Sequence, residues 1–160
     1  MISRVRSGGQ TGVDRAALDC AIELGLPYEG WCPARGWAED YPVPPGLLAD
    51  YPRLRETPSS DPAQRTEWNV RDSDATLILA CADPAANSPG TLLTANVAER
   101  LGRPLLVVSL AGDPGPERLA AFVGSLNLRP IVLNVAGPRE SGCPGIYAAA
   151  KAFLMAALRT

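Results

Sequence analysis

The sequence predicts one α/β domain with a three-layer Rossmann-like fold and a mostly parallel central sheet. Segments typical of strands alternate with segments typical of helices along the chain, as in successive βαβ units. Two strand segments, 75–81 and 104–110, are continuous apolar runs, as expected when helices cover both faces of a sheet. The 160 residues fit a single domain spanning 1–160, long enough to bury a core without disulfides or metals.

The first half of the chain is expected to contribute three strands, two helices and one long loop. The first helix has small apolar residues on one face and is followed by Gly25, a residue typical of helix C-termini. The loop is too rich in proline and glycine for a regular element, and long loops inside compact domains are usually functional. The expected strands are 2–6, 27–32 and 53–57, the helices 13–24 and 62–71, and the loop 33–50.

The second half repeats the alternation more regularly. A glycine follows its first helix, and a proline begins its second. The carboxyl ends of parallel strands meet at one edge of the sheet, so the loops there are expected to form the functional site. The expected strands are 75–81, 104–110 and 130–135, and the helices 91–101, 116–126 and 145–158.

The composition argues against several classes of function. A net charge of −2 gives no electrostatic case for nucleic acid or an anionic membrane as a partner. The chain has no histidine, which excludes Ser-His-Asp and Cys-His catalysis. No secretory signal is visible, and no apolar run approaches the ~20 residues of a membrane helix. A cytoplasmic location is therefore expected.

The four cysteines, Cys20, Cys32, Cys81 and Cys143, are widely scattered along the chain. They lack the short paired spacings of a zinc site, so no metal site is expected. A reducing compartment argues against disulfides. We therefore expect free thiols that are buried or partly buried.

The loop 7–12, Ser-Gly-Gly-Gln-Thr-Gly, joins the first strand to the first helix. Its glycines let the backbone turn sharply, and the amides and dipole of a helix start favour an anion. We expect it to bind a small phosphate-bearing ligand, with the missing β-carbon of Gly9 leaving room for the phosphate; a tight turn without a ligand is the alternative. The loop matches neither the lysine-containing triphosphate motif nor GxGxxG. The expected ligand contacts are Ser7, Gly8, Gly9, Gln10, Thr11, Gly12, Asp14 and Arg15.

A second glycine loop, 87–94, follows the central apolar strand and again opens a helix. Gly90 and Thr91 are the ligand contacts expected here. Two such loops on neighbouring strands would clamp a ligand from both sides, whereas the Pro-Gly pair alone is only a turn. Thr94 is expected to lie away from the phosphate.

The segment 7–19 resembles the opening motif of the molybdenum carrier family, the molybdenum cofactor carrier proteins of the Rossmann-like group that includes the Lonely Guy proteins. The similarity continues in order through short motifs to the segment 135–141. It implies a homo-oligomer that binds the molybdenum cofactor (molybdopterin) through its phosphate and pterin. Such a carrier protects the cofactor and transfers it, with a molybdoenzyme or a cofactor-synthesis enzyme as partner. Pro89 stands where the family usually has the first of two glycines.

Aromatic and acidic residues lie around and after the end of the second strand and are candidates for the pterin. A flat pterin stacks well on a tryptophan such as Trp31 or Trp37, although covering the core edge is the alternative for each ring. Glu39 and Asp40 suit the amino-pyrimidine edge of a pterin, because carboxylates accept paired hydrogen bonds; fixing the loop is their alternative role. Arg35 is a candidate anion clamp.

Polar residues of the helix 62–71 share one face at helical spacing. Arg65, Thr66, Asn69 and the following Asp72 are expected to look into the ligand cleft, although a solvated face has the same pattern. The segment Arg139-Glu140-Ser141 follows a strand and a Gly-Pro turn. It is expected to form a salt bridge within its loop, an oligomer contact or a cleft lid.

Two other functions remain open. One is a nucleotide phosphoribohydrolase like the Lonely Guy enzymes, whose glycine loop is followed by a catalytic glutamate. Thr94 occupies that position here, which favours a carrier and assigns no catalytic residue. The other is a nucleotide-sensing module. Identifying the small molecules that the protein carries would separate the three.

Overall fold

The computed structural model describes residues 1–83, 88–112 and 114–159. Its six strands form one sheet in the order β3-β2-β1-β6-β4-β5, and every strand pair is parallel. The predicted three-layer α/β fold with a mostly parallel central sheet is therefore confirmed. The strands are β1 (Ile2–Arg6), β2 (Tyr28–Cys32), β3 (Leu54–Glu56), β4 (Ala75–Ala80), β5 (Leu105–Ser109) and β6 (Ile131–Ala136).

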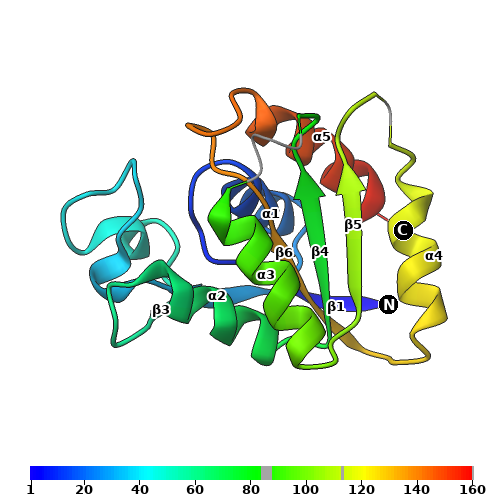
Figure 1. The fold of residues 1–160 in the computed structure, drawn as a ribbon, viewed down its shortest axis with the longest axis horizontal. Coiled ribbons are helices and arrows are strands. Elements are labelled where there is room, and N and C mark those ends of the chain that lie inside the picture. Colours follow the sequence, from blue (N-terminus) through cyan, green and yellow to red (C-terminus); the bar gives the residue numbers. More distant parts are fainter. Residues whose placement is uncertain (84–87, 113, 160) are drawn as a thin grey trace.

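Four α-helices connect strands in the described part of the chain, a fifth follows β6, and together they cover the two faces of the sheet (Figure 1). Helices α2 and α3 lie on one face, while α1, α4 and α5 pack on the other, around the larger core cluster. That cluster includes the inward side chains of β4 and β6, such as Leu77 and Leu133. The helices are α1 (Val13–Glu23), α2 (Pro62–Arg71), α3 (Pro89–Arg100), α4 (Glu117–Ser125) and α5 (Ile146–Ala157).

Local sequence signals explain where the helices begin and end. Gly25 follows α1 with a φ of 67°, the left-handed conformation that its role as a stop requires. Asp61 caps α2 by accepting a hydrogen bond from the Ala63 amide, and Pro62 takes the first helical position. Helix α3 begins at Pro89, earlier than predicted, because Ser88 is its N-cap.

The segment 33–50 has no long regular element, as predicted. It forms two short 3-10 helices, η1 (Ala34–Gly36) and η2 (Gly46–Ala49). It covers a smaller apolar cluster that includes Leu18, Leu47 and Leu54, on the α1 side of the sheet. The loop therefore has a core of its own, which fixes its position beside the first glycine loop.

Three expectations about the sheet and the cysteines are wrong. Strands β1 and β4 are not neighbours, because β6 lies between them. Strand β5 is an edge strand and leaves Val107 exposed, although its sequence is continuously apolar. Cys81 and Cys143 form a disulfide: they follow the adjacent strands β4 and β6, which bring their Cα atoms to 6.4 Å, within the usual range.

The other two cysteines are buried thiols, as expected. Burial raises the pKa of both Cys20 and Cys32 to about 11, so the unreactive thiol form dominates at neutral pH. No helix within the described part of the chain is long and apolar enough to cross a membrane.

Candidate functional site

A cleft of about 500 Å³ lies where the carboxyl ends of β1, β4 and β6 meet. The two glycine loops both reach it although their strands are not neighbours. Strand β6 ends between them in the small residues Ala136 and Gly137, and a β-carbon on Gly137 would lie 2.4 Å from the Leu79 carbonyl oxygen. The cleft is lined by Gln10, Asp14, Arg65, Thr66, Ser88, Gly90, Thr94 and Arg139, among others.

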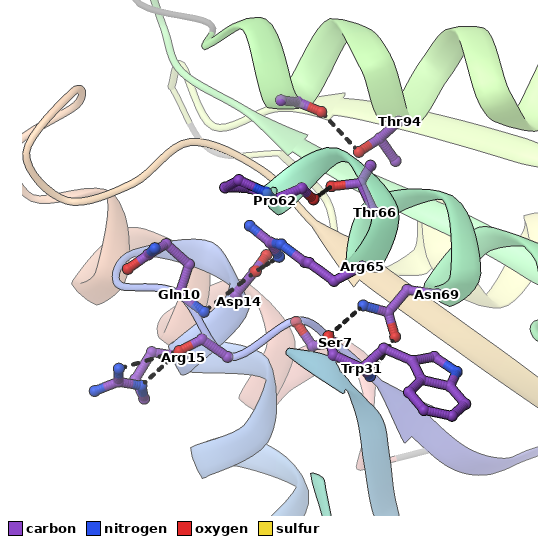
Figure 2. Close-up of polar contacts among 12 residues, drawn as sticks. Ser7, Gln10, Asp14, Arg15, Trp31, Pro62, Arg65, Thr66, Asn69 and Thr94 are labelled. Atoms are coloured by element: carbon purple, nitrogen blue, oxygen red, sulfur yellow. Dashed lines mark hydrogen bonds and ion pairs between the residues drawn. The ribbon is translucent and has the colours of Figure 1, made fainter. Parts of the chain in front are cut away.

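A buried ion pair forms one wall of the cleft. Arg65 Nη1 donates to Asp14 Oδ2 at 2.7 Å, and the same oxygen accepts from the Gln10 amide at 3.3 Å (Figure 2). Asp14 lies in the first turn of α1, where the helix dipole favours its negative charge. The Nε of Arg65 is also buried and has no hydrogen-bond partner among the described residues. One donor of this guanidinium therefore has no partner in the described part of the chain.

In the first glycine loop, the positions where Gly8 and Gly9 lack a β-carbon point toward other protein atoms. Gly9 has a φ of 72°, and a β-carbon there would lie 3.0 Å from Leu54 Cδ1 and 3.2 Å from Leu47 Cδ1. On Gly8 it would lie 1.8 Å from Arg65 Nη1. The expectation that a side chain at Gly9 would intrude on a phosphate is therefore wrong. It would press into the smaller core cluster.

The second glycine loop, unlike the first, has space for a β-carbon at its glycine, Gly90. Among the described residues, a β-carbon on Gly90 would meet only Ser88 Oγ, at 3.7 Å, and Gly90 is exposed in the cleft. Ser88 Oγ accepts from the Thr91 amide at 3.4 Å and caps α3. Thr94 Oγ1 donates to the Gly90 carbonyl at 2.9 Å. Thr94 lines the same cleft as Gly90.

Glu39 joins three loops instead of facing the cleft. Its carboxylate accepts hydrogen bonds from Thr11 Oγ1 and, at 2.7 Å, from Ser141 Oγ. Its amide donates to Gln10 Oε1 at 2.9 Å. Burial opposes ionisation, but the hydrogen bonds from Thr11 and Ser141 outweigh it and hold the pKa of Glu39 below its ordinary value. Glu39 thus has the loop-fixing role that was its alternative.

Arg15 and Asp40 form a second set of contacts that holds the first glycine loop in place. Arg15 donates to both carboxylate oxygens of Asp40, at 2.8 and 3.0 Å, and these hydrogen bonds lower the pKa of Asp40. Arg15 also donates to the Gly9 carbonyl at 3.2 and 3.0 Å. Its guanidinium lies over the rings of Tyr41 and Tyr51. Arg15 therefore holds the loop, and neither it nor Asp40 lines the cleft.

The comparisons with known proteins agree with this architecture. The model of the circularly permutated YpsA SLOG family matches residues 5–158. The chain belongs to this family. It is also similar to the Syntrophus aciditrophicus SB "Putative molybdenum carrier protein", with a TM-score of 0.85 and 39% identity over 98% of this chain and 95% of that one. The comparison with curated proteins finds no significant match. The resemblance to molybdenum carriers is thereby confirmed.

Of the four polar residues predicted on one face of α2 and just after it, this SLOG-family chain brings two, Arg65 and Thr66, to the cleft. Asn69 binds the backbone of Trp31 instead, accepting from its amide at 2.8 Å and donating to its carbonyl at 2.9 Å. Asp72 accepts from Trp31 Nε1 at 2.8 Å. The indole of Trp31 points away from the Asp14–Arg65 pair (Figure 2), and none of these three residues lines the cleft.

A second hollow, of about 450 Å³, adjoins the cleft of the SLOG domain at Pro62, which lines both. Arg35 and Trp37 line it, and the Arg139 guanidinium from the cleft lies 5.6 Å from the centre of the Trp37 ring. Arg139 was not among the residues assigned to the ligand. Its position after a strand and a Gly-Pro turn is the signal that could have included it.

Proposed function

We propose that this protein binds the molybdenum cofactor, or a related phosphorylated pterin, in the cleft at the start of α3, protects it and transfers it. The observation that carries the proposal is the buried Nε of Arg65, a charged donor without a partner among the described residues, in the wall of this cleft. Unpaired buried donors are rare in native proteins, and a bound ion is one of the explanations for them.

The second glycine loop is the better candidate for the phosphate. Gly90 leaves open space at the start of a helix of 12 residues, whose dipole favours an anion. Arg65 and Arg139 line the same cleft and suit phosphate because guanidinium groups donate paired hydrogen bonds. In the first loop, Asp14 already supplies negative charge at the start of α1, which makes a second anion there unfavourable.

The adjoining hollow suits a flat ring. Trp37 offers an aromatic surface, and Arg139 lies between it and the cleft. A ligand with a phosphate at α3 and a pterin beside Trp37 would use both hollows. The name of the similar Syntrophus protein includes a molybdenum carrier role, which supports this ligand class.

The carboxylates of the cleft favour binding over hydrolysis. Asp14 is held by Arg65, and Asp61 accepts from the Ala63 amide as the cap of α2. Thr94, where the Lonely Guy enzymes have their glutamate, donates to a carbonyl of its own helix. A general base needs a carboxylate that is free to reach water or substrate.

Mass spectrometry of the small molecules released from the purified protein tests this proposal. We expect a molybdopterin-type pterin or its oxidation product, at a ratio near one per chain. Release of a nucleotide instead would contradict the carrier assignment and favour the hydrolase or sensing alternatives. No released pterin, together with no rise in melting temperature on adding molybdopterin, would contradict ligand binding itself.

The proposed carrier works as a homo-oligomer and hands its cargo to a molybdoenzyme or receives it from a cofactor-synthesis enzyme. The outward face of α5 consists of small residues, which allow close approach of a second copy. Sedimentation at micromolar concentration is expected to give a multiple of the chain mass of 16.8 kDa. A species of that mass alone would contradict the oligomer.

A further inference from the structure

An arginine-rich hollow of about 540 Å³ lies on the opposite face of the sheet from α1, over β1, β2 and β3. Side chains alternate along a strand, so the residues that flank buried Val5 and Leu54 point to this face. All-parallel sheets usually have both faces covered. Here helices α2 and α3 leave this part open, and its lining includes Arg4, Arg6, Arg53 and Arg55.

The charges in this hollow are unbalanced. Its lining includes four arginines but two carboxylates, Glu29 and Asp72, which leaves a surplus of two positive charges in a chain whose net charge is −2. Glu29 binds Arg4 at 2.7 Å and also binds Arg6. Asp72 accepts from Trp31 Nε1 at 2.8 Å and is paired with Arg71 at 2.6 Å. Both carboxylates are therefore already engaged.

The unpaired positive charge belongs to Arg53 and Arg55. Neither has an ion-pair partner among the described residues, and both are exposed. Arg53 lies over the ring of Tyr28, 5.7 Å from its centre, and Arg55 stands opposite Trp31 in the pairing of β3 with β2. These two guanidinium groups without an ion-pair partner thus flank a hollow whose lining also includes Trp31.

We propose that this hollow is a second binding site, separate from the cleft, for a small phosphate-bearing ligand. Guanidinium groups bind phosphate through paired hydrogen bonds, and strands give the site a rigid floor. The volume lies within the ~300–1,000 Å³ typical of small-ligand sites. A two-fold contact with a second copy is disfavoured, because it would bring like-charged arginines face to face.

Calorimetric titration with inorganic pyrophosphate tests the second site, using Gly90→Val protein so that binding in the cleft is weakened. We expect this variant to bind pyrophosphate. Adding Arg53→Gln and Arg55→Gln should weaken binding at least tenfold. Arg118→Gln with Arg129→Gln removes the same charge from exposed positions outside the hollow and should change binding less than twofold.

Two results would overturn the proposal: no pyrophosphate binding by the Gly90→Val protein, or equal binding by the two double-arginine variants. Circular dichroism of each variant checks its fold. Quenching of Trp31 fluorescence provides a second readout, since Trp31 lines the hollow and not the cleft. Loss of pterin binding in the cleft would leave these results unchanged, so the two sites are tested separately.

Discussion

Asp14 and Arg65 form a buried ion pair, 2.7 Å long, that joins the start of α1 to α2 across the first glycine loop. The side chain of Asp14 is only 4% exposed and that of Arg65 13%. A carboxylate so deeply buried depends on its partner, because desolvation of a lone charge is costly. The pair therefore fixes both the loop and the wall of the cleft.

Replacing Arg65 by methionine should destabilise the protein by about 3–5 kcal/mol, because it leaves Asp14 buried without a counter-charge. Urea unfolding measures the loss. The matched control is Arg100→Met, which breaks an exposed pair with Glu67 and should cost at most about 1 kcal/mol. Equal losses of unfolding free energy for the two variants would show that the buried pair contributes no more to stability than the exposed pair.

Gly9→Ala should lower stability more than Gly25→Ala. Both glycines have positive φ, 72° and 67°, so both variants carry the backbone strain of about 1–2 kcal/mol. Only at Gly9 would the new methyl group also meet the leucines of the smaller core cluster, whereas Gly25 has open space. Thermal unfolding of the two proteins isolates the packing contribution. The same melting temperature for both would contradict the crowding described at Gly9.

Glu39 should make the fold sensitive to acid. Its folded pKa lies below the ordinary value of 4.5, so its hydrogen bonds contribute stability that is present above that value. This contribution is lost as the pH falls below about 4.5 toward the folded pKa. Glu39→Gln should therefore flatten the fall in unfolding free energy between pH 6 and 3. Glu99→Gln, at an exposed position of α3, removes the same charge without these hydrogen bonds and should leave the slope unchanged.

The disulfide should stabilise the chain when it is present. Cys81 and Cys143 are separated by 62 residues, and cross-links over loops of this size typically contribute roughly 2–4 kcal/mol. Reduction with dithiothreitol should lower the urea midpoint of the parent protein and leave that of Cys143→Ser unchanged. If the oxidised protein has four alkylatable thiols, the two cysteines are not bonded.

Much of the fold was predictable because local signals agree with tertiary packing. Strand β1 and helix α2 have the predicted bounds, and Gly25 ends α1 as expected. The order of strands was not predictable, because β6 inserts between β1 and β4 from a distant part of the sequence. The same long-range pairing brings Cys81 close to Cys143, which their spacing along the chain does not reveal.

The candidate site was predictable in outline only. Both glycine loops do line one cleft, yet sequence alone does not say which glycine is open. The space beside Gly9 is occupied by leucines of the smaller core cluster, whose positions follow no periodic pattern in the sequence. Gly90, in contrast, faces the cleft. Trp31 lies in β2, near the expected strand end, but its side chain points to the face of the sheet opposite α1, because its direction depends on which neighbours cover β2.

The most direct test of the proposed function is calorimetric titration of Gly90→Val and Gly124→Val proteins with molybdopterin. Both glycines lie in helices, and a β-carbon clashes at neither, so both proteins should fold. Only Gly90 lines the cleft. Losing one hydrogen bond to a charged phosphate costs roughly 1.5–3 kcal/mol, so Gly90→Val should weaken binding at least tenfold. Gly124→Val should bind like the parent protein. Equal affinity of the two variants would contradict ligand binding at the start of α3.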